Sequence, residues 1–318
     1  MRPVEVLGKR WAHPIACASG ALAAHRPGME NAVLRGAAAI FTKTVTESPR
    51  EGHPGPVFVD YLDEGYALNA MGLPNPGPDR MVVEIEEFRD EFDVPVYASV
   101  AADGPEGFKR LARAFSGVAD GLELNVSCPH AGKGYGAELG SDPEAVAEIT
   151  EAAVRAFDGP VSVKLTPNVD RETLLEVAAA AIDAGAEALT AVNTLGPGLR
   201  IDLRTASPVL GAGVGGLSGP ALKPIALRVV ADLALEFGEE VEIIGVGGIR
   251  NGEDVVEFLF AGAKAVQVAT AAREKDFGDI AMETSHILKE LGYDGPEEAI
   301  GAALPEYRER LRRLGWCQ

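Results

Sequence analysis

Eight short β-type runs alternate with helix-like segments along this chain of 318 residues, and this alternation constrains its fold more than any other feature. The runs span 14–19, 38–44, 96–101, 121–127, 161–166, 188–193, 241–247 and 265–271. Short buried strands separated by helices indicate parallel strands with helical crossovers. Eight such units close into a barrel, so the sequence predicts an α/β fold of the (β/α)8 TIM-barrel type. A doubly wound sheet remains the alternative, because short apolar runs do not fix the order of strands.

The remaining segments predict how the barrel is closed and covered. A turn at Gly8–Lys9 suggests an N-terminal hairpin. The irregular stretches 46–80 and 194–217 are too long for ordinary connections, and long loops in a compact domain are usually functional. We interpret them as insertions over the C-terminal face of the barrel. No change in composition marks a second domain, so residues 1–318 are expected to form a single domain.

Composition excludes several classes of function. The net charge of −19 argues against a nucleic-acid partner, because a phosphate backbone would be repelled. The sequence contains no run of about 18 apolar residues, so no membrane span is expected. The N-terminus lacks the features of a signal peptide. Cys17, Cys128 and Cys317 form no CxxC pair, which argues against a disulfide framework or an iron–sulfur cluster. The few cysteines indicate a cytoplasmic protein, and His13, His25 and His53 lack partners at metal-ligand spacing, so we expect no metal site.

Polar side chains gather where the predicted strands end. Lys43 and Lys164 interrupt apolar runs, and a lysine inside a strand is costly unless something anionic meets it. Each alone could be an ordinary strand-terminal lysine, but two of them together indicate an anionic or electron-rich ligand. The other polar residues near strand ends are Ser19, Thr44, Asn125, Asn193, Thr194 and Thr270.

Two glycine-rich segments suggest a phosphate site. Gly215–Gly216, with Ser218–Gly219, precedes a helical segment, and Gly247–Gly248 follows the seventh run. Backbone amides at the start of a helix bind phosphate, and barrels often hold a phosphate after their last two strands. A glycine pair alone is more often only a turn, so the two positions together carry the interpretation.

The segment ELNVSCPHAGKGYG, residues 123–136, places the thiol of Cys128 in a loop just after the fourth run. A lone cysteine is more often a small core residue. A thiol with an ordinary pKa of roughly 8.5 acts as a base only where the thiolate is favoured. His130 and Lys133 lie close enough in the sequence to favour it.

Taken together, the motifs resemble those of the class 1 dihydroorotate dehydrogenases along nearly the whole chain. The matching segments are ASG (18–20), FTKT (41–44), NAMGLPNPG (69–77), LNVSCP (124–129), VKLTPN (163–168), AVNT (191–194), GGLSGPALKPIALR (215–228), GVGGI (245–249) and FLFAGAKAVQVATA (258–271). The resemblance implies a barrel that binds FMN and oxidises dihydroorotate to orotate in de novo pyrimidine (UMP) biosynthesis.

The resemblance also implies roles for individual residues. Cys128 would be the catalytic base, with hydride passing from the substrate to FMN. The implied FMN-binding residues are Ser19, Lys43, Thr44, Asn125, Lys164, Asn193, Gly216, Ser218, Gly219, Gly247, Gly248 and Thr270. The implied substrate-binding residues are Lys43, Asn69, Met71, Gly72, Leu73, Asn125, Asn193 and Thr194.

Two alternatives and one partner also follow from the motifs. His130 stands where most of these enzymes have an asparagine, and the SCPH sequence is similar to the pyrimidine domain of dihydropyrimidine dehydrogenase, which acts on uracil or thymine. A flavin-free, phosphate-binding lyase or isomerase is the alternative outside this class. The loop at 191–210 resembles the class 1B catalytic subunit, which implies an iron–sulfur flavoprotein electron-transfer subunit and a homodimer or heterotetramer.

Overall fold

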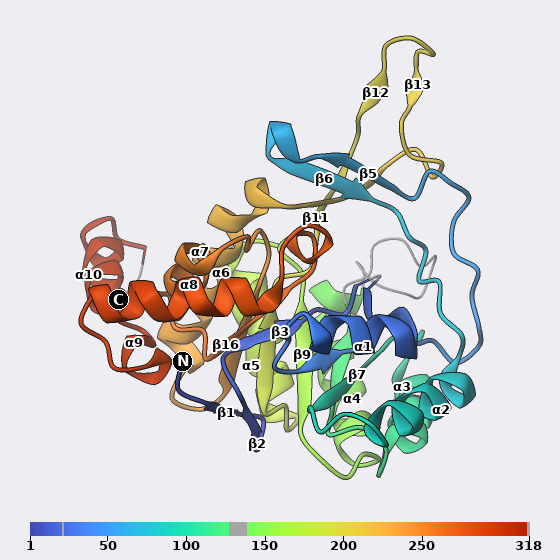
Figure 1. Cartoon of the computed structure of the whole chain (residues 1–318), viewed down its shortest axis with the longest axis horizontal. Helices are drawn as coiled ribbons and strands as arrows, with labels where there is room; N and C mark the ends of the chain where they lie inside the picture. Colours follow the sequence, from blue (N-terminus) through green and yellow to red (C-terminus); the bar gives the residue numbers. More distant parts are fainter. Residues whose placement is uncertain (21, 127–138, 317–318) are drawn as a thin grey trace.

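Eight parallel strands close into a barrel in the part of the chain that the structure describes, residues 1–20, 22–126 and 139–316 (Figure 1). The structure is a computed structural model. In order around the barrel, the strands are β10 (Ala188–Ala191), β15 (Glu242–Val246), β16 (Ala265–Val268), β3 (Ile15–Cys17), β4 (Ile40–Phe41), β7 (Val96–Val100), β8 (Gly121–Asn125) and β9 (Val161–Leu165). Because β10 also pairs with β9, the barrel is confirmed and the doubly wound sheet is excluded. Each strand lies inside its predicted run.

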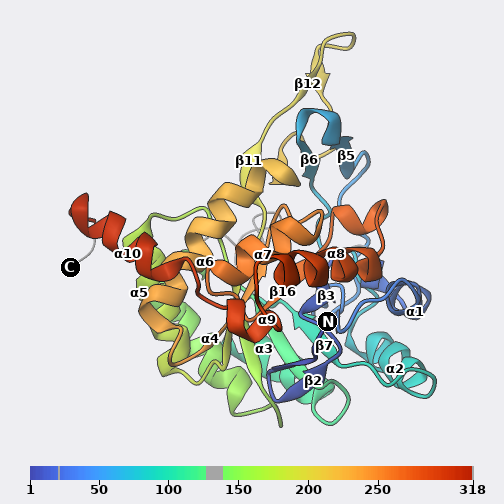
Figure 2. The same ribbon diagram turned by 60° about the vertical axis from the view of Figure 1, so that its left-hand side comes forward.

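Helices surround the barrel, as the view in Figure 2 shows. They are α1 (Arg26–Leu34), α2 (Pro78–Arg89), α3 (Pro105–Phe115), α4 (Pro143–Val154), α5 (Arg171–Asp183), α6 (Lys223–Phe237), α7 (Gly252–Phe260), α8 (Phe277–Glu290), α9 (Pro296–Ala299) and α10 (Leu304–Arg313). Single 3-10 turns are η1 (Leu22–Ala24), η2 (Leu62–Glu64), η3 (Leu139–Ser141), η4 (Pro220–Leu222) and η5 (Ala271–Arg273). Side-chain caps fix three helix starts: Asp142 for α4, Asp170 for α5 and Asn251 for α7 each accept a backbone N–H of the first turn.

An aromatic cluster, formed by Trp11, Phe41 and Tyr97, fills the amino-terminal end of the barrel. All three side chains are fully buried, and the rings of Phe41 and Tyr97 stack with centroids 4.7 Å apart. The Trp11 indole donates to the Tyr97 hydroxyl at 3.1 Å, which donates to the Val6 carbonyl at 3.2 Å. Val6 belongs to the predicted hairpin, which is confirmed as β1 (Val4–Val6) and β2 (Lys9–Trp11). The hairpin and the aromatic cluster therefore close this end of the barrel.

The two long insertions form a cap over the opposite, carboxyl end, as expected. Four of their strands make an antiparallel sheet in the order β11 (Leu195–Gly198), β14 (Gly215–Ser218), β6 (Tyr66–Asn69) and β5 (Phe58–Tyr61). Between β11 and β14, the short strands β12 (Ile201–Asp202) and β13 (Ser207–Pro208) form an arm that projects from the molecule (Figure 1). The first insertion ends where α2 begins at Pro78. The cap sheet is thus built from segments far apart in the sequence.

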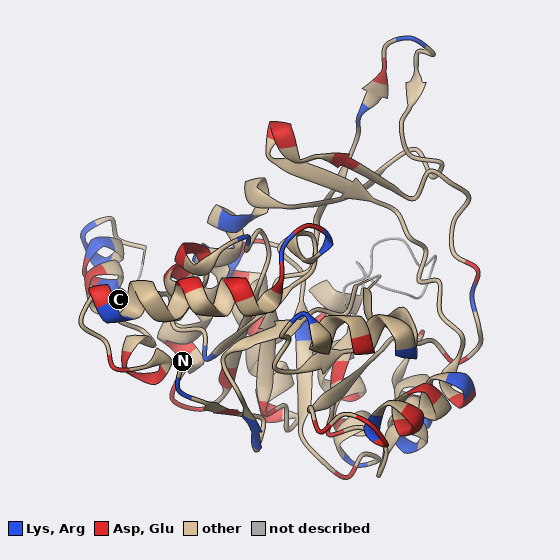
Figure 3. Ribbon diagram, in the orientation of Figure 1, with Lys and Arg blue, Asp and Glu red and all other residues tan. Residues whose placement is uncertain are grey.

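Acidic and basic side chains are spread over the outer helices and loops (Figure 3). A few charged residues are instead buried inside the barrel, namely Lys43, Glu123 and Lys164.

Among the described residues, no helix is both long and apolar enough to cross a membrane. The same residues contain no group of three or more His, Cys, Asp or Glu that could hold a metal ion.

Candidate active site

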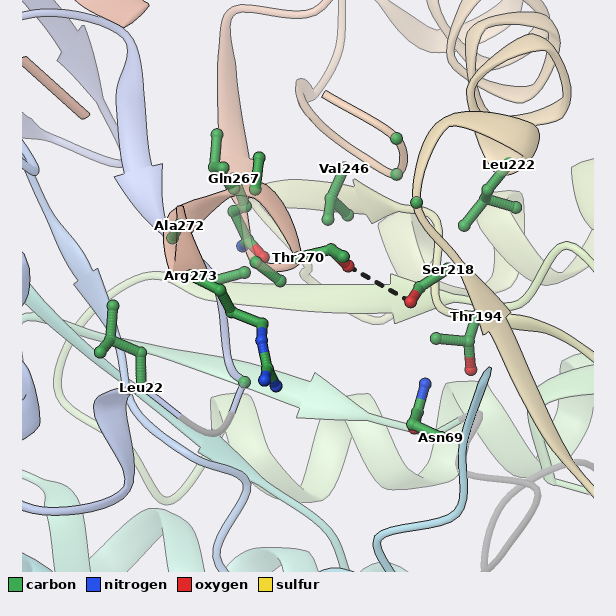
Figure 4. A pocket seen from close by; sticks show the side chains of 18 of the residues that line it. Leu22, Asn69, Thr194, Ser218, Leu222, Val246, Gln267, Thr270, Ala272 and Arg273 are labelled. Atoms are coloured by element: carbon green, nitrogen blue, oxygen red, sulfur yellow. Dashed lines mark hydrogen bonds between the residues drawn. The ribbon is translucent and has the colours of Figure 1, made fainter. Parts of the chain in front are cut away.

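A cavity of about 1320 Å³ lies at the carboxyl end of the barrel, beneath the cap sheet (Figure 4). Ligand pockets are commonly about 300–1,000 Å³, so this volume exceeds what one small substrate needs. Its lining includes these residues predicted from the sequence: Ser19, Lys43, Thr44, Asn69, Met71, Gly72, Leu73, Asn125, Lys164, Asn193, Thr194, Ser218, Gly219, Gly247, Gly248 and Thr270. Cys128, His130 and Lys133 lie outside the described residues. The structure thus brings together residues from the carboxyl ends of several barrel strands and from the cap.

Two buried lysines reach into this cavity. Lys43 is 6% exposed and Lys164 is 5% exposed, so neither is an ordinary surface lysine at a strand end. The Lys164 ammonium donates to the Ser19 hydroxyl at 2.9 Å. It also lies 3.4 Å from Oε1 of Glu123 and 3.4 Å from Oε1 of Gln267. The positive charge of Lys164 is therefore held at the base of the cavity by side chains from three other parts of the barrel.

Side-chain amides and hydroxyls form a chain along another wall of the cavity. Ser99 and Thr44 share a hydrogen bond at 3.0 Å, and the Asn125 amide donates to the Thr44 hydroxyl at 3.1 Å. Asn193 Nδ2 donates to Asn125 Oδ1 at 3.2 Å, and the backbone N–H of Thr194 donates to Asn193 Oδ1 at 2.8 Å. An amide offers donors and an acceptor, which suits a ligand with both kinds of group.

The turn after β6 reaches the cavity with unusual backbone geometry. Gly72 and Leu73 both have positive φ angles, 73° and 55°. A Cβ atom on Gly72 would lie 2.6 Å from the backbone nitrogen of His53, so the turn requires glycine there. Asn69, at the end of β6, donates to the carbonyl of Gly216 at 3.2 Å. The turn is thereby fixed against both the other insertion and the chain before β5.

Gly216 has a different place from the one that the sequence suggested. Gly215–Gly216 lies in β14 of the cap sheet and not in a turn at the start of a helix. A Cβ atom on Gly216 would lie 2.2 Å from the Thr194 hydroxyl oxygen, so glycine permits close packing of β14 against that residue. Gly216 does not line the cavity, whereas Ser218 and Gly219 do.

Two glycine turns meet at one end of the cavity, beside the start of α6. Gly247 and Gly248 follow β15 with φ angles of 128° and 79°, and Gly219 precedes η4 with φ 84°. A Cβ atom on Gly248 would lie 2.8 Å from the backbone nitrogen of Lys223 and 2.9 Å from the Gly219 carbonyl. Beside them, the Thr270 hydroxyl donates to the Ser218 hydroxyl at 3.2 Å (Figure 4). Backbone and hydroxyl groups that line the cavity, together with the nearby start of α6, could hold a phosphate group.

Lys223 joins the two helices that begin at this cradle, a role that sequence reasoning missed. Its ammonium, at the start of α6, contacts Asp254 Oδ1 at 2.6 Å and also the carboxylate of Glu257, both on α7. Partial burial alone would lower the pKa of Lys223, but the two carboxylates outweigh it and raise that pKa. Asp254 also accepts the backbone N–H of Arg250, which lines the cavity. The available signal for Lys223 was its place within the GGLSGPALKPIALR segment.

Two further polar residues fix the cavity wall and were also missed. Buried Asn75 accepts the backbone N–H of Thr46 at 3.2 Å and donates to the Leu73 carbonyl at 2.8 Å, so it ties the turn to the end of the second barrel unit. Arg35, after α1, donates to the carbonyls of Ala272 and Lys275, which holds η5 in place. For Asn75 the signal was its place within the NAMGLPNPG segment.

Cys17 is the cysteine that the structure describes, whereas the motif points to Cys128. Cys17 is buried in β3 and also lines the cavity. Burial raises the pKa of its thiol to about 12, although the charge of Arg35 opposes the shift. A thiol with so high a pKa is almost entirely protonated near neutral pH, so Cys17 is not suited to act as a base.

A family model described as dihydroorotate dehydrogenase matches residues 1–292. The chain belongs to the dihydroorotate dehydrogenase family. A relative from Pyrococcus abyssi is 43% identical over 308 residues, which cover 96% of this chain and 99% of that protein. A second, from Methanothermobacter thermautotrophicus, is 40% identical over 299 residues and covers 92% of this chain and 94% of its own length. Both are named catalytic subunits of dihydroorotate dehydrogenase B (NAD(+)).

The fold agrees with a solved structure of the family. The crystal structure of dihydroorotate dehydrogenase from Eimeria tenella, in complex with ferulenol, aligns with a TM-score of 0.83 at 21% sequence identity. The alignment covers 94% of this chain and 88% of that chain. At this identity the similarity shows the barrel fold alone.

Proposed function

We propose that this chain is the catalytic subunit of a class 1B dihydroorotate dehydrogenase, which oxidises dihydroorotate to orotate in the de novo synthesis of pyrimidines. The observation that carries the proposal is one cavity that combines two buried lysines, a chain of side-chain amides and a glycine cradle, in a member of this family. The residues of the cavity divide into a region for FMN and a region for substrate.

The described residues fit FMN. Gly219, Gly247 and Gly248 line the cavity with positive φ angles that favour glycine, and the hydroxyls of Ser218 and Thr270 lie beside them. We propose that this cradle holds the phosphate and that Ser19, Lys43, Thr44, Asn125, Lys164 and Asn193 surround the ring system. FMN supplies the acceptor for a hydride when it is bound. The ammonium of Lys164 stabilises negative charge at the ring, because it is buried and held in place.

The amide side chains and the Asn69–Leu73 turn form the proposed substrate site. Asn125 and Asn193 present amides whose orientation is fixed by their mutual hydrogen bond. Dihydroorotate has alternating N–H and C=O groups, which such amides recognise from both sides. We propose that the backbone of the turn, at Met71, Gly72 and Leu73, receives its carboxylate, with the Lys43 charge nearby.

Cys128 is the proposed base. It lies outside the described residues, and its assignment rests on the ELNVSCP motif that follows β8. Asn125, three residues earlier, lines the cavity, so the chain enters this segment from the substrate site. The thiolate of Cys128 would take a proton from the ring carbon next to the one that loses hydride. The protonated Cys17 thiol offers no competing base.

The relatives' names support the proposed assembly. Proteins 40–43% identical to this chain are named catalytic subunits, which implies a separate subunit for electron transfer. We propose that residues 1–318 act as one FMN-binding domain in the cytoplasm, as a homodimer or as a heterotetramer with an iron–sulfur flavoprotein that passes electrons to NAD.

An anaerobic bleaching experiment tests the proposed reaction. The FMN-loaded protein is mixed with dihydroorotate or with dihydrouracil, and flavin absorbance near ~450 nm is followed. Dihydroorotate should bleach the flavin far faster, because dihydrouracil leaves the carboxylate site without a partner. Equal bleaching would favour a uracil- or thymine-type enzyme. Failure to bind FMN would instead support a flavin-free lyase or isomerase.

A further inference from the structure

Glu123 and Gln267 meet across the inside of the barrel. Glu123 lies in β8 and Gln267 in β16, which are separated around the barrel by β3, β4 and β7 on one side and by β9, β10 and β15 on the other. Nevertheless, Gln267 Nε2 donates to Glu123 Oε2 at 2.7 Å. Both side chains are buried, with exposures of 0% and 1%. A single short hydrogen bond thus spans the barrel directly below the cavity.

Lys164 completes this cluster. Its ammonium lies 3.4 Å from the other carboxylate oxygen, Glu123 Oε1, and 3.4 Å from Gln267 Oε1. Burying a carboxylate is costly unless it is both paired and hydrogen-bonded. Here Glu123 is paired with Lys164 and hydrogen-bonded to Gln267, so the three side chains form one satisfied unit.

The hydrogen bonds also fix the direction of the Gln267 amide. A carboxylate only accepts, so Glu123 forces the NH2 group of Gln267 toward itself. The carbonyl oxygen of Gln267 then faces the Lys164 ammonium. If the amide turned over, two oxygens would face each other and an NH2 group would face the ammonium. Glu123 therefore orients Gln267, and both then hold Lys164 in place.

We infer that Glu123 is a positioning residue that acts through Gln267 to hold the Lys164 ammonium toward the flavin and to offset part of its positive charge. This inference rests on the proposed binding of FMN. Glu123 does not line the cavity, whereas Lys164 and Gln267 do, so its effect reaches the ligand through them. Glu123 would have two effects. It would keep the Lys164 ammonium fixed and charged. It would also limit how strongly the site favours reduced flavin, so that the flavin can pass its electrons on.

Glu123→Gln tests both parts of this role. Glutamine has almost the same shape but accepts with only one atom, so either the contact with Lys164 or that with Gln267 is lost. We expect the dissociation constant of oxidised FMN to rise about tenfold, as for one lost charge-assisted hydrogen bond. Because a buried negative charge is removed, the ratio of affinities for reduced and oxidised FMN should also rise about tenfold. For a two-electron couple, this equals a midpoint potential about 30 mV higher.

Two other variants separate position from charge. Gln267→Met removes the bridging amide and keeps both charges, so it should weaken FMN binding without changing the affinity ratio. It also serves if Glu123→Gln does not fold. Glu84→Gln is the matched control, because Glu84 is a buried carboxylate on α2 that pairs with Arg80, away from the cavity. FMN affinity is measured by titrating the apoprotein, and potentials by dye-equilibrated reduction.

The outcomes distinguish the inference from the proposed function. If the unaltered protein does not bind FMN, the proposed function fails. If it binds FMN but Glu123→Gln leaves the affinity ratio unchanged or lowers it, the charge-balancing role of Glu123 is wrong. If Gln267→Met binds FMN as the unaltered protein does, the bridge does not position Lys164.

Discussion

Asn193 donates a hydrogen bond to Asn125 across the mouth of the barrel, from Nδ2 to Oδ1 at 3.2 Å. The Asn125 amide in turn donates to the Thr44 hydroxyl at 3.1 Å. These two bonds fix both amides, because turning either one would place two donors or two acceptors against each other. The pattern of donors and acceptors on this wall of the cavity is therefore set before any ligand binds.

Asn193→Asp should disrupt this pattern more than Asn193→Ala. An aspartate would place a carboxylate oxygen against Asn125 Oδ1 and would repel an anionic substrate. We expect kcat/KM for dihydroorotate to fall about 100-fold, mainly through KM, from a lost hydrogen bond and like-charge repulsion. Steady-state kinetics at equal FMN content measures the change. A fall in Asn193→Asp no larger than in Asn193→Ala would contradict the electrostatic argument.

Cys128→Ala should separate FMN binding from chemistry. Removal of a general base lowers the rate by roughly 10²–10⁴-fold. We therefore expect normal FMN affinity together with slow bleaching of the flavin by dihydroorotate in single-turnover experiments. Bleaching at the rate of the unaltered protein would show that another group takes the proton.

Lys223→Met should weaken the phosphate cradle. Lys223 pairs with Asp254 and Glu257, so it holds the start of α6 against the start of α7. Without it, we expect FMN affinity to fall about tenfold, as for the loss of one partly buried charge-assisted contact. The matched control is Lys264→Met, which breaks the ion pair between Lys264 and Glu242. Neither of these two residues lines the cavity. Similar losses of affinity in both variants would point to general destabilisation.

Tyr97→Phe should destabilise the fold without changing the cavity. The hydroxyl bridges the Trp11 indole and the Val6 carbonyl, and its removal leaves both groups buried without that partner. The expected loss is about 1–3 kcal/mol in the free energy of unfolding. Urea unfolding measures it, with an unchanged m value as the check on a two-state comparison. A loss close to zero would mean that the aromatic packing alone holds this end of the barrel.

Asp120 should make the protein sensitive to acid. Burial alone would raise the pKa of its carboxyl, but hydrogen bonds from Lys9, the backbone of Val96 and Arg89 outweigh burial and lower it. A folded-state pKa below the unfolded value gives stability that is fully present above about pH 3.9 and is lost as the pH falls further. The stability advantage over Asp120→Asn should therefore be constant above about pH 3.9 and shrink as the pH falls below that value. An advantage that does not vary with pH would contradict this linkage.

The barrel was predictable because each strand is a short buried apolar run and helical segments recur between the runs. The strand ends were less predictable: β4, for example, ends at Phe41, and the backbone has already left the ladder at Lys43. The pairing of β6 with β14 could not be derived from the sequence, since these strands come from two insertions and no local pattern links them.

The site was predicted mainly where a polar residue interrupts an apolar run. Lys43 and Lys164 were found in this way, and buried Glu123 carries the same signal within ELNVS, although its role was not recognised. Gln267 gives a weaker signal, because an uncharged amide is common in strands. The misplaced residue, Gly216, shows the limit of motif reasoning: a glycine needed for strand packing looks like one needed for a turn.

The aromatic cluster of Trp11, Phe41 and Tyr97 gives the barrel a sealed base. In the part of the chain that the structure describes, the residues that line the cavity come from the carboxyl ends of the barrel strands and from the cap, and none belongs to the aromatic cluster. A substrate and its product therefore enter and leave the cavity at the same end of the molecule. Such shared access favours turnover in alternation, with orotate leaving by the route through which dihydroorotate arrived.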